Sequence, residues 1–123
     1  MNKKLRILIA EDERAIASAL DLKLKHEGFE TKVVFNGIDA VELIKEEKFD
    51  LLILDLIMPQ LDGFGVLESL KEKGVKMPII VASNLSQAED INKAKDLGAS
   101  DFFVKSDTPV AEIVEKIKKY FKP

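Results

Sequence analysis

The chain has 123 residues, of which 46% are hydrophobic and 33% charged, and its formal net charge is −3. This length predicts a single domain, residues 1–123, with enough apolar residues for a hydrophobic core. The absence of cysteine excludes disulfides and thiolate metal sites, and a lone histidine, His26, excludes a multi-histidine metal site. The slight negative charge argues against direct binding of nucleic acid or a membrane surface. Because no long apolar run or signal-like segment is present, we expect a cytoplasmic protein.

Apolar residues alternate along the chain between the spacing of strands and the spacing of helices. Short apolar or β-branched runs predict five strands, at residues 5–10, 31–35, 51–56, 78–83 and 101–105. Residues at helical spacing predict a helix after each strand, and Gly28, Gly74 and Gly98 follow three of these helices. The last helix is expected to have Thr108 as its N-cap and Pro109 at its first position.

Strict alternation of strand and helix is typical of a parallel sheet with helices on both faces, which is the α/β class. The runs at 5–10, 51–54 and 78–82 contain almost no polar residue, as expected for strands buried on both faces. The run at 31–35 is short and more polar, so we expect it at an edge of the sheet.

Polar side chains follow most of the predicted strands, at the point where each strand ends. The residues in question are Glu11, Asp12 and Glu13 after the first strand, Asp55 at the third, Ser83 at the fourth and Lys105 at the fifth. The second strand is followed by Asn36 and Gly37, which read as a plain turn. In an open α/β sheet, ligands bind outside the carboxyl ends of the strands. These side chains are therefore expected to converge on one rim.

Taken singly, these residues have ordinary structural explanations. The acidic run 11–13 could complement the first turn of a helix, Ser83 could close a turn, and Lys105 could be a solvated surface residue. Together they indicate chemistry, because neighbouring carboxylates repel unless a cation lies between them. Oxygen ligands favour a hard ion such as Mg²⁺, and a lysine and a hydroxyl can bind an anion that joins the metal. These groups can stabilise phosphoryl transfer, with Asp55 as the acceptor.

Four stretches, ILIAEDE, LILDLIMPQLDG, VAS and GASDFFVK, resemble the receiver domain of two-component response regulators, and the likeness extends over essentially the whole chain. It is similar to the chemotaxis-type single-domain regulator. The resemblance implies a flavodoxin-like, doubly wound five-stranded parallel sheet of order 2-1-3-4-5 with five helices on its two faces. It implies a phosphoacceptor rather than an enzyme. A sensor histidine kinase or phosphotransfer protein is the implied donor, and a downstream protein is expected to bind the face formed by the fourth helix, fifth strand and fifth helix.

The resemblance also implies a role for individual residues. These are Asp55 as phosphoacceptor; Glu11, Asp12, Asp55 and the backbone carbonyl of Ile57 as Mg²⁺ ligands; Ser83 and Lys105 as contacts of the phosphoryl group; and Ser83 with Phe102 as the switch pair. By the same analogy, the apolar Ile57 and Leu85 flank the path of an attacking water. We therefore expect slow loss of the phosphoryl group.

Two residues depart from the family pattern. Ser106 follows Lys105 where proline is usual, and Asn84 follows Ser83 where a small residue is usual. A cis bond before a residue other than proline costs about 3 kcal/mol, so the Lys105–Ser106 bond is expected to be trans. Asn84 is expected to narrow access to Asp55.

Three other functions remain as alternatives. A haloacid dehalogenase-type phosphatase also uses an aspartate at a strand end, but it requires a second acid where this chain has Ile57. A flavodoxin-type flavin carrier requires a first loop that binds phosphate, which the acidic run 11–13 would repel. A receiver-like interaction domain without chemistry is the third. The sequence also leaves open whether the chain acts alone or forms part of a longer regulator.

Overall fold

The computed structural model describes residues 4–122 as one parallel sheet with helices between its strands. The strands are β1 (Arg6–Ala10), β2 (Glu30–Val34), β3 (Leu51–Leu54), β4 (Ile79–Ser83) and β5 (Asp101–Val104). The helices are α1 (Arg14–His26), α2 (Gly37–Glu46), α3 (Gly63–Glu72), α4 (Ala88–Asp96) and α5 (Val110–Tyr120), with a 3₁₀ turn, η1 (Lys105–Asp107), before α5. The sheet order is β2-β1-β3-β4-β5. This confirms the predicted flavodoxin-like α/β fold of order 2-1-3-4-5, including the edge position of the polar second strand.

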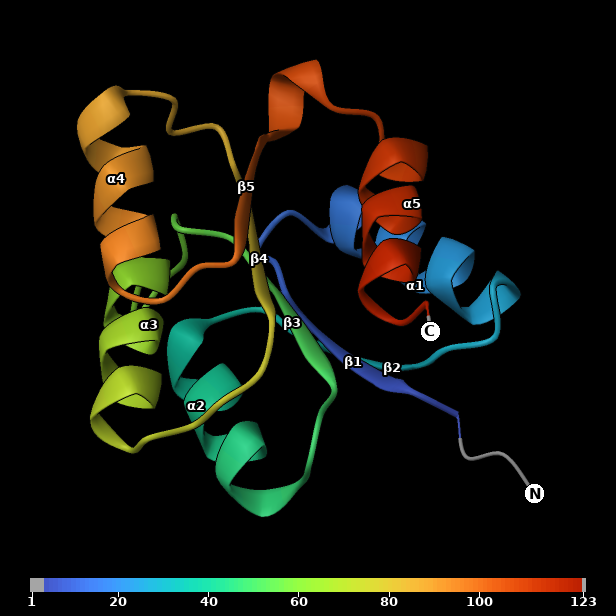
Figure 1. Cartoon of the computed structure of the whole chain (residues 1–123), viewed down its shortest axis with the longest axis horizontal. Helices are drawn as coiled ribbons and strands as arrows, with labels where there is room; N and C mark the ends of the chain where they lie inside the picture. Colours follow the sequence, from blue (N-terminus) through green and yellow to red (C-terminus); the bar gives the residue numbers. More distant parts are fainter. Residues whose placement is uncertain (1–3, 123) are drawn as a thin grey trace.

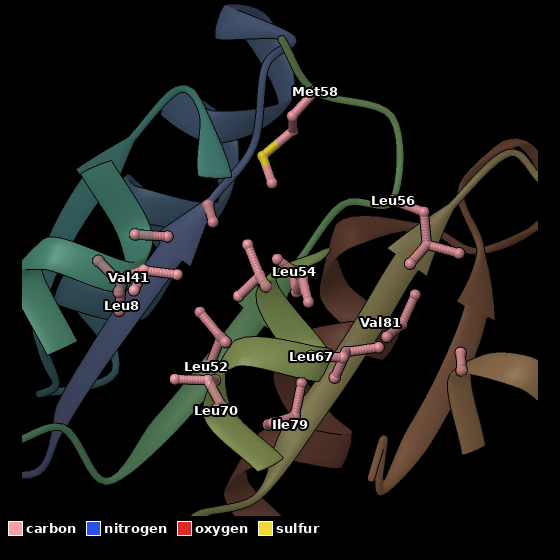
Figure 2. Close-up of a cluster of buried hydrophobic side chains, with 14 residues drawn as sticks. Leu8, Val41, Leu52, Leu54, Leu56, Met58, Leu67, Leu70, Ile79 and Val81 are labelled. Carbon is pink, nitrogen blue, oxygen red and sulfur yellow. The ribbon is translucent and has the colours of Figure 1, made fainter. Parts of the chain in front are cut away.

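The helices form a layer on each face of the sheet, with α2, α3 and α4 on one face and α1 and α5 on the other (Figure 1). Successive strand residues point to opposite faces, so β1 and β3 supply both layers. Leu8, Leu52 and Leu54 pack in the α2–α4 layer, where Leu67 and Leu70 of α3 meet them (Figure 2). The α1–α5 layer receives the intervening residues Ile7, Ile9, Leu51 and Ile53. Burial on both faces explains why these strands read as continuous apolar runs.

The register of the sheet brings the polar residues at its carboxyl end together. Ala10 of β1 is paired with Leu54 of β3, so Glu11 and Asp55 follow on neighbouring strands. The N–H of Asp55 still donates to the carbonyl of Ala10, at 2.9 Å, which fixes the backbone of Asp55 one residue past the strand.

Several predicted boundaries are wrong. The third strand ends at Leu54 rather than at residue 56, because the chain turns there into a loop closed by a bond from Gly63 N–H to the Leu56 carbonyl, at 3.0 Å. Thr108 is not the N-cap of the last helix. Pro109 holds that position, since the 3₁₀ turn η1 moves the start of α5 on to Val110.

Asn36 is likewise more than part of a plain turn, because it caps α2. Its side-chain oxygen accepts a hydrogen bond from the N–H of Asp39 at 2.8 Å, and Gly37 opens the helix. A Cβ on Gly37 would collide with the backbone carbonyl of Leu61, so only glycine allows this contact. The start of α2 therefore supports the loop that follows Asp55.

None of the helices within residues 4–122 combines the length and the apolar character that a membrane span requires.

Candidate functional site

A small cavity of about 110 Å³ lies at the carboxyl ends of the strands. Its walls come from the segments that follow four of the strands, β1, β3, β4 and β5. The residues that line it are Asp12, Glu13, Asp55, Ile57, Asn84 and Lys105. Four of these lining residues, Asp12, Asp55, Ile57 and Lys105, have a role predicted from the sequence. The other two, Glu13 and Asn84, have none.

The ammonium group of Lys105 binds three carboxylates at this rim. Its Nζ lies 3.1 Å from both carboxylate oxygens of Glu11, 2.9 Å from Oε1 of Glu13 and 3.2 Å from Oδ2 of Asp55. The side chains of Lys105, Glu11 and Asp55 are only 6%, 2% and 4% exposed, whereas that of Glu13 is 54% exposed. One cation is thus shared among three acids, two of which are buried.

The excess of acid changes the ionisation of this cluster. Burial, together with the charge of Asp55, raises the pKa of Glu11 to about 7, although the N–H of Glu13 and the ammonium of Lys105 both favour its charged form. Burial opposes the charge of Lys105, but the hydrogen bond to Glu13 and the charges of Asp55 and Glu11 outweigh it. The pKa of Lys105 is therefore raised above its ordinary value. A further cation at this rim would relieve the repulsion between the carboxylates.

Asp55 presents its carboxylate to the cavity from the end of β3. Oδ1 accepts a hydrogen bond from the N–H of Ile57 at 3.3 Å, and Oδ2 faces Lys105. Asp12 is exposed and lines the same cavity, and the side chain of Ile57 is largely exposed there. The structure thus brings Glu11, Asp12, Asp55 and Lys105 together, as the sequence predicts.

The predicted ligands of Mg²⁺ match that ion in chemistry, although the rim is not yet arranged as a metal site. Within residues 4–122, no three acidic or histidine side chains are grouped so as to hold a metal ion directly. The ammonium of Lys105 lies between Glu11 and Asp55 instead. The available donors are carboxylate and carbonyl oxygens, which suit a hard divalent cation. Binding would require Lys105 to release these two carboxylates.

Neither of the two predicted switch residues is among those that line the cavity. Ser83 is fully buried at the end of β4, and its Oγ accepts a hydrogen bond from the N–H of Leu85 at 3.3 Å. Phe102 is partly buried on β5, opposite Val81, and packs against the α2–α4 layer. In this conformation Ser83 therefore holds a turn and Phe102 packs in the core. A function in switching would require both side chains to move.

Leu85, one of the two residues expected to flank the path of an attacking water, is not among the residues that line the cavity. Its side chain is partly buried against the α2–α4 layer, because the turn held by Ser83 directs it toward the core. Ile57, the other of these two residues, does line the cavity. Asn84, the residue before Leu85, is exposed and lines the cavity.

Two contacts at this site were not predicted from the sequence. Glu13 binds Lys105, although the sequence indicates only that it belongs to an acidic run. Asn84 and Ser106, each noted as a departure from the family, are joined by a hydrogen bond of 2.9 Å from Ser106 N–H to Asn84 Oδ1. The structure has no cis peptide bond within residues 4–122, so the expected trans bond between Lys105 and Ser106 is confirmed.

Comparison with known proteins identifies one family. The model of the response regulator receiver domain matches residues 7–118. Curated relatives include the transcriptional regulatory protein DltR of Streptococcus agalactiae, 37% identical over 101 residues, which are 82% of this chain and 45% of DltR. The cell cycle response regulator CtrA of Brucella ovis is 35% identical over 101 residues, which are 82% of this chain and 44% of CtrA. The chain thus spans somewhat less than half the length of these relatives.

Solved structures agree with this match. The receiver domain of the Francisella response regulator 1452 aligns with a TM-score of 0.89 and 28% identity, over 97% of this chain and 100% of that one. A CheY-like receiver domain protein from Methanospirillum hungatei aligns with a TM-score of 0.88 and 26% identity, over 96% and 94% of the two chains. With this fold, and with the family match over nearly its whole length, the chain belongs to the response regulator receiver domain family.

Proposed function

We propose that Asp55 accepts a phosphoryl group from a sensor histidine kinase or phosphotransfer protein in a Mg²⁺-dependent reaction. The observation that carries this proposal is the environment of Asp55. Its buried carboxylate faces a small cavity, 3.2 Å from the ammonium of Lys105 and beside Glu11, whose pKa is raised. A carboxylate needed only for folding would gain nothing from such an excess of neighbouring acid.

In the proposed reaction, the P–N bond of the donor phosphohistidine breaks as a P–O bond forms to an Asp55 carboxylate oxygen. The electron pair of the broken bond stays on the donor imidazole. A bound Mg²⁺ would offset the charge of the incoming group, with Glu11, Asp12, Asp55 and the backbone carbonyl of Ile57 as its ligands from this chain. Lys105, released from Glu11 and Asp55, would then pair with the oxygens of the transferred phosphoryl group. Their negative charge would replace that of the two carboxylates as the partner of the ammonium group.

The proposed switch follows from the demand of a new dianion for hydrogen-bond donors. The hydroxyl of Ser83 would leave the N–H of Leu85 and donate to the phosphoryl group, and the ring of Phe102 would follow it. We propose that a downstream protein then binds the face formed by α4, β5 and α5. In support, α4 has a single buried residue, Ala94, so little apolar contact opposes a shift of this helix.

The alternative functions fit this site less well. A dehalogenase-type phosphatase would require an acid at position 57, where the apolar Ile57 lines the cavity. A flavin carrier would require a phosphate-binding first loop, where Glu11 and Glu13 lie instead. We propose that the chain acts as one receiver unit, as a phosphoacceptor rather than an enzyme. Because its net charge is −3, we expect this unit to bind proteins rather than nucleic acid.

The decisive experiment is incubation with acetyl phosphate and Mg²⁺, followed by intact-mass measurement or Phos-tag electrophoresis. We expect one phosphoryl group on the wild-type protein, none on Asp55→Asn, and none when EDTA removes the metal. Glu47→Gln is the matched control, since it neutralises an acid at the opposite end of the sheet and should leave labelling unchanged. Labelling that persists in Asp55→Asn, or that proceeds equally in EDTA, would contradict the proposal. An unlabelled wild-type protein would favour the interaction domain without chemistry.

A further inference from the structure

The two residues that depart from the family pattern contact each other. Asn84 lies in the loop after β4 and Ser106 in the turn after β5, 22 positions apart in the sequence. The N–H of Ser106 donates to Oδ1 of Asn84 at 2.9 Å. The backbone pairing of β4 with β5 ends at Ser83 and Val104. The side chain of Asn84 thus links the segments that follow β4 and β5, just beyond the last paired residues.

This link depends on the identity of both residues. Proline at position 106 would have no N–H to donate, and a small apolar residue at position 84 would have no oxygen to accept. Both residues are exposed, so water competes for these groups and the bond is retained only where the loops hold it in place.

The position of the bond connects it with the cavity over Asp55. Asn84 and Lys105, the neighbour of Ser106, both line the cavity, so the bond joins two parts of its wall. The cavity has a volume of about 110 Å³. Since a water molecule occupies about 30 Å³ of liquid, there is room for little more than a phosphoryl group and a few waters. Asp55 itself is only 3% exposed, so an opening in this wall would increase its access to water.

We propose that the hydrogen bond between Asn84 and Ser106 is a latch that holds the β4–β5 side of the cavity closed and restricts the entry of water to Asp55. This inference rests on the proposed phosphorylation of Asp55. In this role Asn84 is a positioning residue, since it acts through the loop that carries Lys105. Opening the latch should let water reach the acyl phosphate more often, and so shorten the lifetime of phosphorylated Asp55.

Substitutions at position 84 separate the hydrogen bond from the bulk of the side chain. Asn84→Leu keeps a side chain of similar size and removes the acceptor, whereas Asn84→Ala removes both size and acceptor. Ser106→Ala is the matched control, because it keeps the backbone N–H that donates. Each variant would be phosphorylated with acetyl phosphate and Mg²⁺ and freed of donor, and its decay would be timed by Phos-tag electrophoresis. We expect Asn84→Leu and Asn84→Ala to decay about three- to tenfold faster than wild type, as for the loss of one hydrogen bond, and Ser106→Ala to match wild type.

Amide hydrogen exchange gives a second readout that does not depend on phosphorylation. In Asn84→Leu, exchange at the Ser106 amide should accelerate about tenfold relative to wild type, while exchange at Val104 within β5 should not change. Decay of Asn84→Leu at the wild-type rate would mean that size alone controls access, and would overturn the latch. An unchanged Ser106 amide in that variant would do the same. A wild-type protein that takes up no phosphoryl group would overturn the proposed function, and with it the role of the latch in phosphate lifetime.

Discussion

The two ends of the sheet carry clusters of charged side chains that differ in how well opposite charges are matched. At the amino end, the guanidinium of Arg6 binds Glu30 at 2.6 Å, the carbonyl of Lys48 at 2.7 Å and the carboxylate of Glu47. Lys32 also binds Glu47, at 2.9 Å. In these ion pairs, two cations thus meet two carboxylates. The hydrogen bonds from Arg6 and Lys32 hold the pKa of Glu47 below its ordinary value.

At the carboxyl end the same kinds of group are out of balance. One lysine, Lys105, serves Glu11, Glu13 and Asp55, and the pKa of Glu11 is raised rather than lowered. A dense charged cluster therefore does not by itself stabilise a fold, because the direction of the pKa shifts within it depends on charge balance and burial. The balanced cluster favours the charged form of Glu47, whereas the unbalanced one leaves a demand for a cation that the proposed chemistry would satisfy.

The largest effect is expected in the pH dependence of stability. Because the folded protein holds a proton on Glu11 more tightly than the unfolded chain does, the contribution of Glu11 is fully present below pH 4.5 and is lost as the pH rises to about 7. Glu11→Gln removes this dependence. In urea unfolding with EDTA, wild type should lose about 3 kcal/mol relative to Glu11→Gln between pH 4.5 and 8.

The opposite cluster provides the control for this prediction. The pKa of Glu47 is lowered, so its contribution is present above its unfolded pKa and is lost as the pH falls. Glu47→Gln should therefore lose stability relative to wild type at neutral pH, and the difference should shrink on acidification. If both variants change with pH in the same direction, the contrast between the two clusters is wrong.

The second effect comes from removing the cation of the balanced cluster. Arg6→Met deprives Glu30 and Glu47 of their shared partner and leaves the carbonyl of Lys48 without this donor. We expect Tm to fall by several degrees, while Asp55 takes up a phosphoryl group from acetyl phosphate at the wild-type rate. A slower uptake in Arg6→Met would show that the two ends of the sheet are not independent.

The third effect is the response to Mg²⁺, which should act at one end of the sheet only. Binding to the folded state stabilises it by mass action, by about 1.4 kcal/mol when Mg²⁺ is at ten times its Kd. Wild type and Arg6→Met should gain equally in urea unfolding with added Mg²⁺. Asp12→Asn should gain much less, since it removes a proposed ligand that is exposed at the cavity. An equal gain in Asp12→Asn would argue against that assignment.

The features that could be predicted from the sequence are those that follow from the spacing of apolar residues and from the positions where strands end. Glu11, Asp55 and Lys105 each follow a strand directly, so a correct assignment of strands was enough to bring them together. The bond between Asn84 and Ser106 depends on the course of two loops, which no local pattern encodes.

The same limit applies to Leu85 and to the balanced cluster. The direction of Leu85 depends on the turn held by Ser83, and the guanidinium of Arg6 meets partners 24 to 42 positions away through a rotamer that follows from packing. The sequence could therefore locate the site, but it could not describe its walls or the charge balance at the far end of the sheet.

Backbone conformation shows the same difference between the two ends as the charges. Three glycines with positive φ, Gly28, Gly74 and Gly98, follow helices and precede strands at the amino end. Within residues 4–122, the one other residue type with positive φ is Gln60, at 68°, in the loop after Asp55. A side chain in this region costs roughly 1–2 kcal/mol, so the carboxyl end retains strain that the amino end avoids.

The smallest effect is expected from releasing this strain. Gln60→Gly should stabilise the protein by about 0.5 kcal/mol, because the gain in backbone energy is partly offset by the greater freedom of glycine in the unfolded chain. The matched control is Gly98→Ala, where φ is 112° and nothing lies within 4 Å of the added Cβ. Only the strain of a side chain at positive φ acts there, so the free energy of unfolding should fall. Urea unfolding of both variants measures the two changes. A loss of stability in Gln60→Gly would mean that the Gln60 side chain makes a compensating interaction, and that backbone strain does not distinguish the two ends.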